Sequence, residues 1–276
     1  MASLRAGKYE LPLDRPRVMG VVNVTPDSFY DGGRHADPAA AIAHGRRLAQ
    51  EGADLLDIGG ESSRPGAAPV AGEEELARIL PVLEALADLR LPLSVDTTKP
   101  EVMRAALAHG AAMINDVTAL AAPGALELVA ASEAAVCLMH MQGSPRTMQA
   151  DPVYADVVGE VREFLAARAG ACVAAGIARE RIVIDPGFGF GKTVEHNFTL
   201  LARLGEIAAL GPPVLAGWSR KSSLGRITGR AADERLAASL AAAVLAVQRG
   251  ARIVRVHDVA ATRDALAVLA AVERGG

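Results

Sequence analysis

Short apolar runs rich in β-branched residues alternate along the chain with longer segments of helical spacing. The first clear run, at 18–24, holds four valines and carries Asn23 near its end. Seven comparable runs follow at 53–60, 91–96, 111–116, 134–140, 181–185, 213–217 and 251–258. Apolar runs of this length are typical of strands that are buried on both faces of a parallel sheet.

The segments between these runs carry helix signals. Asp37 and Pro38 place a capping acceptor and a proline where a first helix would begin. Three glutamates at 73–75 favour a second helix start, because a helix N-terminus stabilises negative charge. We expect helices at 37–50, 73–86, 98–109, 123–131, 154–175, 194–204, 233–249 and 262–273.

Strict alternation of strand and helix implies a parallel sheet with right-handed crossovers. Eight such units predict an α/β fold that closes into a (β/α)8 TIM barrel, and an open doubly wound sheet is the alternative. The chain has 276 residues, and a single barrel of this kind has about 250. A domain size of about 150 residues would instead suggest two domains. No linker marks a boundary, so we expect one domain over 1–276, with 1–16 as an irregular or hairpin lead-in that closes the barrel bottom.

Composition narrows the classes of partner. The formal charge of -3 and the pI near 6.1 indicate no basic surface for nucleic acid. The longest charge-free stretch with a helical pattern, 236–248, is too short to span a bilayer. The N-terminus has no apolar core of a signal peptide, so we expect a cytoplasmic protein without a membrane partner.

Every apolar run finishes on a polar or charged group: Asn, Asp, Glu, His or a Ser-Arg-Lys cluster. One polar strand end has little meaning, because strands often end at solvent. Eight such ends on the same side of their strands indicate a common site, since the active sites of TIM barrels lie at the carboxyl ends of the strands.

Three familiar site types are not supported. The glycine-rich segment 187–193 fails as a P-loop, because Pro186 stands where the first glycine is needed. It also fails as a dinucleotide fingerprint, because Lys192 stands where a glycine is needed. No Cys/His spacing matches a zinc site, and no G-x-S-x-G elbow supports a serine hydrolase. Of the scattered histidines, His140 and His257 end strands and are the candidates for function.

The strand ends suggest their own chemistry. Asp96, Asn115 and Asp185 offer two carboxylates and an amide toward the barrel interior. This set suits a flat heterocycle with an amidine-like donor edge, because carboxylates accept pairs of N–H groups well. Lys221 and Arg255 supply donors and a cation–π plane for the same ring.

A second group of strand-end residues suits a phosphate. Asn23, Ser222, Arg255 and His257 end strands or begin the loops that follow them. Their hydroxyl, amide and cationic groups can hold phosphate oxygens together with a hard cation that takes oxygen ligands.

Several ordered motifs now match one family. They are G-V-V-N-V-T-P-D-S-F at 20–29, D-I-G-G-E-S-S-R-P-G at 57–66, S-V-D-T at 94–97, I-N-D at 114–116, M-H-M-Q-G-S-P-R-T-M-Q at 139–149, D-P-G-F-G-F-G-K at 185–192, G-W-S-R-K-S at 217–222 and R-V-H-D at 255–258. The sequence resembles the dihydropteroate synthases, a group of pterin-binding enzymes, over nearly its whole length. The resemblance implies a transferase of folate biosynthesis and a sulfonamide target. Such an enzyme joins 6-hydroxymethyl-7,8-dihydropterin diphosphate to p-aminobenzoate and releases pyrophosphate. The resemblance also implies Mg2+ as cofactor and a homodimer.

The resemblance also implies roles for residues that match the family motifs. Asp96, Asn115, Asp185 and Lys221 would hold the pterin, with Arg255 stacked on it. Asn23, Arg255 and His257 would hold the diphosphate, and Asn23 the magnesium. The p-aminobenzoate site would comprise Thr25, Pro26, Ser28, Phe29, Ser63, Arg64, Pro65 and Ser222. Asp31 and Arg64, one on each of two mobile loops, would order these loops over the reactants. The catalytic set would be Asp96, Asp185, Lys221, Arg255 and His257.

The expected mechanism is an SN1-like loss of pyrophosphate, because the aniline nitrogen is already nucleophilic and the leaving group presents the difficulty. Two alternatives remain open from the sequence. A pterin-dependent methyltransferase with a corrinoid partner would share the carboxylate–amide pocket, but it would need neither the first two loops nor a diphosphate site. A non-catalytic pterin-binding paralogue would have lost a residue at the reacting centre, and no such loss is found.

Overall fold

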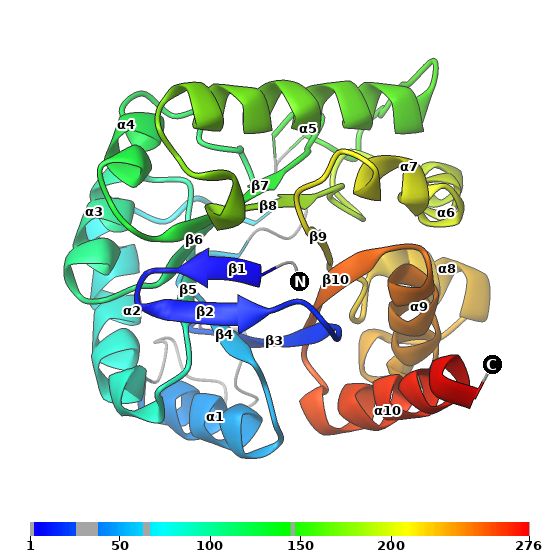
Figure 1. Cartoon of the computed structure of the whole chain (residues 1–276), viewed down its shortest axis with the longest axis horizontal. Coiled ribbons are helices and arrows are strands. Elements are labelled where there is room, and N and C mark those ends of the chain that lie inside the picture. Colours follow the sequence, from blue (N-terminus) through cyan, green and yellow to red (C-terminus); the bar gives the residue numbers. More distant parts are fainter. Residues whose placement is uncertain (1–2, 26–37, 63–66, 145–146, 276) are drawn as a thin grey trace.

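Eight parallel strands close into a barrel in the computed structural model, which describes residues 3–25, 38–62, 67–144 and 147–275. Around the barrel the order is β10-β3-β4-β5-β6-β7-β8-β9 (Figure 1). The strands are β3 (Arg17–Asn23), β4 (Leu55–Gly59), β5 (Leu93–Asp96), β6 (Met113–Asp116), β7 (Ala135–Met139), β8 (Ile182–Asp185), β9 (Val214–Ala216) and β10 (Ala251–Val256). The predicted (β/α)8 barrel is therefore confirmed, and the open sheet is excluded by the pairing of β10 with both β3 and β9.

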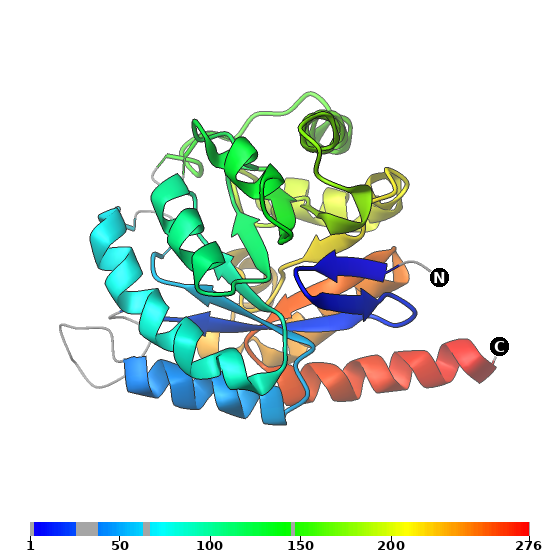
Figure 2. The same ribbon diagram turned by 60° about the vertical axis from the view of Figure 1, so that its left-hand side comes forward.

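Helices form an outer ring around the strands (Figures 1 and 2). They are α1 (Pro38–Gln50), α2 (Gly72–Leu86), α3 (Pro100–Ala108), α4 (Ala125–Ala130), α5 (Val157–Ala174), α6 (Val194–Ala202), α7 (Leu204–Ala208), α8 (Ser222–Thr228), α9 (Leu236–Gln248) and α10 (Val259–Gly275). Short 3-10 turns are η2 (Ala87–Leu89), η3 (Arg179–Arg181) and η4 (Ala232–Glu234). No helix within the described ranges combines the length and apolar character that crossing a membrane requires.

Two helix predictions differ from the structure. The segment expected as one helix at 194–204 is divided into α6 and α7 at Arg203, whose φ of -104° and ψ of 20° leave the helical region. Helix α8 was not predicted, because its seven residues are too few to show an apolar stripe at helical spacing. This omission matters because α8 begins at Ser222, directly after Lys221.

The lead-in segment forms a hairpin below the barrel. Strands β1 (Ser3–Ala6) and β2 (Tyr9–Pro12) pair antiparallel, and Figure 1 shows them lying across the barrel strands. The side chains of Leu4 and Leu13 are buried and pack in one cluster with barrel-interior residues such as Met113. The hairpin therefore packs against the amino-terminal end of the barrel.

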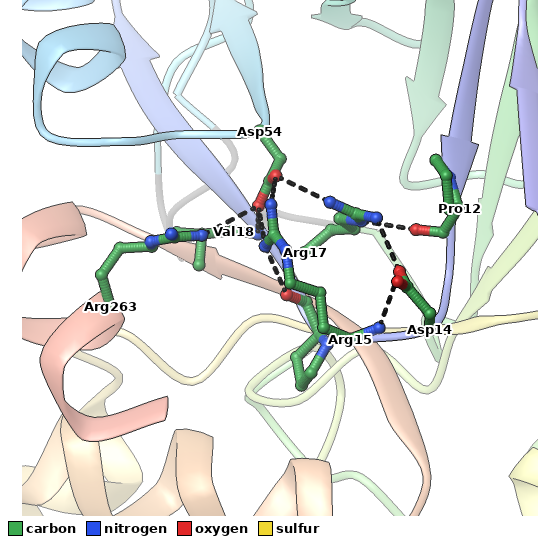
Figure 3. Close-up of polar contacts among 8 residues, drawn as sticks. Pro12, Asp14, Arg15, Arg17, Val18, Asp54 and Arg263 are labelled. Atoms are coloured by element: carbon green, nitrogen blue, oxygen red, sulfur yellow. Dashed lines mark hydrogen bonds and ion pairs between the residues drawn. The ribbon is translucent and has the colours of Figure 1, made fainter. Parts of the chain in front are cut away.

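A polar cluster around Asp54 ties several elements together at this lower end (Figure 3). The Asp54 carboxylate accepts hydrogen bonds from Arg15, from Arg17 and from the backbone N–H of Val18, and Arg263 of α10 lies 3.8 Å away. Burial alone would raise the pKa of Asp54, but the bonds from Arg15, Val18 and Arg17 outweigh it and hold the pKa below its usual range. The cluster joins the lead-in, the start of β3, the chain before β4, and α10, so its role is structural.

Candidate active site

The strand register brings the predicted site residues to one edge of the barrel. Asn23 pairs with Gly59, Gly59 with Asp96, and Asp96 with Asn115, so three neighbouring strand pairs end at the same level. A Cβ atom placed on Gly59 would lie 3.6 Å from the Cβ of Asp96 and 3.9 Å from the amide oxygen of Asn23. The missing side chain of this glycine thus leaves room between the two polar groups.

Arg255 is held by two carboxylates from other strands. Its Nε donates to Oδ2 of Asp57 at 2.6 Å, and its Nη2 donates to Oδ2 of Asp96 at 2.9 Å. Burial would lower the pKa of Arg255, but the charges of Asp57 and Asp96 raise it above its ordinary value. The guanidinium is therefore a fixed cation whose plane is set by β4 and β5.

Asp57 links Arg255 to the amide of Asn115, and it is not among the site residues predicted from the sequence. Its side chain has no exposed surface, and its Oδ2 also accepts a hydrogen bond of 2.9 Å from Nδ2 of Asn115. A signal was present, because Asp57 is a charged residue inside the apolar run 53–60. A buried charge requires a partner, and Arg255 is that partner.

The two predicted pterin carboxylates have perturbed acidities. Burial raises the pKa of Asp96 to about 7, against the lowering effect of Arg255, and Asp57 and Glu75 raise it further. Burial also raises the pKa of Asp185, although its Oδ1 accepts the N–H of Gly187 at 2.7 Å. Burial disfavours the ionised form of both carboxyl groups, so a ligand with N–H groups would stabilise that form.

Lys221 ends the loop after β9, and Ser222 begins α8. The Nζ atom of Lys221 lies 4.1 Å from the centroid of the Phe190 ring, which comes from the loop after β8. Gly189 in the same loop has a φ of +82°, and a Cβ there would lie 3.1 Å from Cδ of Lys221. The glycine-rich segment therefore provides close approach to the lysine, in agreement with the rejection of a nucleotide motif.

His257 follows β10, next to the strand that carries Asn23. Its Nδ1 lies 2.9 Å from Oγ of Ser219, and its backbone N–H donates to the same oxygen at 3.2 Å. Strand β10 pairs with β3 in parallel, so His257 and Asn23 lie at the ends of neighbouring strands. Of the p-aminobenzoate residues, Thr25 follows β3 and is buried, and Ser222 is the first residue of α8.

A second lysine of the region, Lys192, lies buried beneath the site. Its Nζ contacts Nδ1 of His140 at 3.0 Å and the carbonyl oxygens of Gly187 and Phe190 at 3.1 and 2.9 Å. Burial lowers the pKa of Lys192 to about 7, and burial with the nearby Lys192 charge lowers that of His140 to about 3. His140 therefore packs as a neutral ring, and both residues join the loops after β7 and β8.

A cavity of about 230 Å³ opens beside Asp96. Its lining includes Glu61, Glu75 and Thr97. Lys99 forms ion pairs with Glu61, at the base of the loop after β4, and with Glu75 of α2. Glu75, which the sequence indicated only as part of an acidic helix start, has a fully buried side chain.

Seven predicted site residues on the loops after β3 and β4 are not covered by the structure. Pro26, Ser28, Phe29, Asp31, Ser63, Arg64 and Pro65 lie outside the described residues. Within the described ranges the structure brings together Asn23, Asp96, Asn115 and Arg255. Asp57 of β4 contacts two of them, Asn115 and Arg255. Lys221 and Asp185 contact the loop 187–190, on the β8–β9 side of the same barrel end.

Comparison with known proteins identifies the family. The model of the pterin binding enzymes matches residues 19–257. Dihydropteroate synthase of Neisseria meningitidis serogroup B is 54% identical over 271 residues, which are 96% of this chain and 95% of the relative. That of Escherichia coli strain K12 is 50% identical over 262 residues, which are 95% of this chain and 93% of the relative.

Solved structures agree with the sequence comparison. Xanthomonas albilineans dihydropteroate synthase with 4-aminobenzoic acid has a TM-score of 0.93 and 59% identity, and its complex with 7,8-dihydropteroate has 0.88 and 54%. A Yersinia pestis dihydropteroate synthase in a sulfonamide drug complex has a TM-score of 0.94 and 47% identity. Each match covers 99% of both chains. The chain therefore belongs to the pterin binding enzyme family and, within it, to the dihydropteroate synthases.

Proposed function

We propose that this chain condenses 6-hydroxymethyl-7,8-dihydropterin diphosphate with p-aminobenzoate to give 7,8-dihydropteroate and pyrophosphate. The observation that carries the proposal is the hydrogen-bonded network of Asp57, Arg255, Asp96 and Asn115 at the carboxyl ends of the strands. The solved Xanthomonas albilineans relative is bound to 4-aminobenzoic acid in one structure and to 7,8-dihydropteroate in another, which are a substrate and the product of this reaction.

The carboxylates and the amide would recognise the pterin. Its amidine-like edge presents N–H donors, and Asp96 and Asp185 supply acceptors whose pKa values are raised by burial. Asn115, itself bonded to Asp57, would complete the edge, and Lys221 would donate to a ring acceptor. Arg255 is fixed by Asp57 and Asp96 and can stack on the ring as a cation.

The diphosphate would lie toward β3 and β10. Asn23 and His257 end these neighbouring strands, and Arg255 comes from β10 itself. His257 and Arg255 would stabilise the negative charge that develops on the departing pyrophosphate.

The donor set suits a magnesium ion that arrives with the diphosphate. The described part of the chain contains no group of three or more His, Cys, Asp or Glu side chains arranged for a metal. Magnesium needs no such cage, because it is commonly held by one or two protein oxygens together with substrate phosphates. Asn23 would supply the amide oxygen. Bound there, the ion would act as a Lewis acid on the diphosphate oxygens.

Bond breaking would precede bond making. The aniline nitrogen of p-aminobenzoate is nucleophilic as a neutral amine, so the difficult step is the loss of pyrophosphate. The electron-rich dihydropterin can carry positive charge on its exocyclic methylene, and ionised Asp96 and Asp185 would favour that charge. The loops that carry Asp31 and Arg64 would close over the site and exclude water, which would otherwise trap the cation.

The second substrate would bind beside the pterin, next to the start of α8. Thr25, Pro26, Ser28, Phe29, Ser63, Arg64, Pro65 and Ser222 are the residues we assign to p-aminobenzoate. Ser222 begins α8, next to Lys221. This arrangement would place the amine near the methylene carbon of a pterin bound between Lys221 and Arg255.

One assay tests the proposed reaction. Purified protein is incubated with dihydropterin diphosphate and p-aminobenzoate, with Mg2+ and then with EDTA, and dihydropteroate is measured by mass spectrometry. We expect product that depends on the metal, and very little from the Asp185→Asn variant. Pterin binding without product would instead support a methyltransferase or a non-catalytic paralogue.

Assembly and location are proposed on separate grounds. We expect one barrel domain, a cytoplasmic location and a homodimer. Ile227 of α8 and Leu236 of α9 are 59% and 42% exposed, and apolar side chains on neighbouring helices can be covered by a second copy. Light scattering on the purified protein measures the mass directly, and a monomer would contradict the expected dimer.

A further inference from the structure

Two adjacent residues after β9 are bound to two adjacent residues after β10. Ser219 contacts His257 through its Oγ, at 3.2 Å from the backbone nitrogen and 2.9 Å from Nδ1. The next residue, Arg220, forms an ion pair with the next residue, Asp258. Lys221 and His257, the neighbours of this ion pair in the chain, are the residues proposed above to bind the pterin and the diphosphate.

The ion pair has the geometry of a two-point contact. Nη2 of Arg220 lies 2.7 Å from Oδ1 of Asp258, and Nε lies 3.2 Å from Oδ2. Two parallel contacts fix orientation as well as distance, which a lysine in place of arginine could not reproduce. The side chains are 39% and 25% exposed, so the pair contributes little to overall stability.

The backbone of Arg220 also indicates a role other than stability. Its φ is +58°, in the left-handed region that residues with a side chain rarely adopt. Strain of this kind persists where neighbouring groups enforce it, and it occurs often at functional sites. Here the N–H of Arg220 donates to Oγ of Ser239 at 3.0 Å, and its carbonyl oxygen accepts from Nη1 of Arg235 at 3.0 Å.

A turn at 218–221 positions Lys221 at the site. The N–H of Lys221 donates to the carbonyl oxygen of Trp218 at 3.2 Å, which closes the four-residue turn around Arg220. On the other side, the carbonyl oxygen of Asp258 accepts two bonds from Thr262 of α10, at 3.1 Å from N and 2.8 Å from Oγ1. The ion pair between Arg220 and Asp258, which we call the tie, thus joins a turn bonded to α9 with a loop bonded to α10.

We propose that Arg220 and Asp258 are positioning residues that hold Lys221 and His257 in one fixed relative orientation. The proposal rests on the roles given above to Lys221, at the pterin, and His257, at the diphosphate. These groups act on the two ends of the bond that breaks, so an error in their relative placement lowers the rate even when each side chain is intact.

The test compares Asp258→Asn and Arg220→Lys with a matched control. Arg46 and Asp88 also form a two-contact pair, with both nitrogens 3.1 Å from Oδ2, but between α1 and η2. Asp88→Asn therefore removes a similar pair outside the site. For each variant, kcat, the KM for both substrates and the melting temperature are measured.

We expect Asp258→Asn and Arg220→Lys each to lower kcat/KM for the dihydropterin diphosphate by about tenfold. The double variant should lose no more than either single variant, because both remove the same tie. The melting temperature should move no further than in Asp88→Asn, whose kinetics should match the unchanged protein. Unchanged kcat/KM, or losses that add in the double variant, would overturn the proposal. A melting temperature that falls in step with activity would overturn it as well.

Two reference variants distinguish a failure of the positioning role of Arg220 and Asp258 from a failure of the roles proposed for Lys221 and His257. Lys221→Met and His257→Gln should each lower kcat/KM more than the tie variants do. If both reference variants keep full activity, the proposed roles of these residues fail. If they lose activity while Asp258→Asn and Arg220→Lys do not, the tie alone fails.

Discussion

Oδ2 of Asp57 lies 2.6 Å from Nε of Arg255, although 198 positions separate the two residues in the chain. The same oxygen receives Nδ2 of Asn115 at 2.9 Å, so one fully buried atom connects β4, β6 and β10. Arg255 can orient a ring only if its own plane is fixed, and Asp57 fixes it from below the pocket.

Replacing Asp57 by asparagine should therefore damage activity without any direct contact to substrate. The amide would remove the negative charge that offsets Arg255 in a buried place, and such a loss is costly. We expect kcat/KM to fall by at least about 100-fold, mainly through weaker pterin binding. Ser94→Ala is the control, because Ser94 pairs with Asp57 in the sheet and its buried Oγ has no hydrogen-bond partner within the described residues. Equal kinetics in Asp57→Asn and Ser94→Ala would contradict the assigned role.

Pterin affinity should depend on pH through Asp96. Its pKa in the free pocket is about 7 because it is buried, and N–H donors of the pterin would favour the ionised form. Below pH 7 binding must therefore release a proton, so affinity should fall as the pH falls, by up to about tenfold per unit. Calorimetry with 6-hydroxymethylpterin at pH 7.5, 6.5 and 5.5, in buffers of different ionisation enthalpy, measures both quantities. The dependence should disappear in Asp96→Asn, and an affinity that is flat in the unchanged protein would refute the argument.

Asp185→Asn should abolish turnover chiefly by weakening pterin binding. The substitution keeps one acceptor but adds a donor that faces the N–H edge of the ligand, so we expect the pterin Kd to rise by about 100-fold. Asp116→Asn is the comparison, because Asp116 also ends a strand but is engaged by Thr118 and Leu120 of its own loop. That variant should lose stability and keep its pterin affinity. Unchanged pterin affinity of Asp185→Asn in calorimetry would reject the assignment.

The barrel could be predicted from the sequence because its signal is repeated and local. Each strand is a short apolar run such as 182–185, and several helices begin with a capping residue, a proline or acidic side chains. Elements that are too short to show an apolar periodicity are harder to predict from the sequence. Helix α8 has seven residues, and Arg203 interrupts a continuous apolar pattern by its backbone angles alone.

The site could be predicted only where polar residues end strands. Strand ends predict Asp96, Asn115 and Asp185 as site residues, and the parallel register accounts for the close placement of Asp96 and Asn115. Asp57 and Lys192 were missed, because their importance depends on partners 198 and 52 positions away. The tie between Arg220 and Asp258 likewise requires coordinates, since no spacing rule relates two loops that follow different strands.

The cluster below the barrel offers a test of stability that leaves the site unchanged. Asp54 is 9% exposed and receives Arg15, Arg17 and the N–H of Val18. Asp54→Asn should lower the free energy of unfolding at pH 7 by about 2 kcal/mol, because hydrogen bonds to a charged group are lost. Since the folded pKa of Asp54 lies below its unfolded value, this contribution is present above about pH 4 and disappears as the pH falls through the folded pKa. Urea unfolding of both proteins at pH 7 and pH 3 should therefore show a difference that shrinks in acid.

Asp14→Asn, at a carboxylate that is 54% exposed and pairs with Arg17, is the control and should change stability by less than about 1 kcal/mol. A loss from Asp54→Asn that is the same at both pH values would show that the ionised carboxylate does not provide the stabilisation.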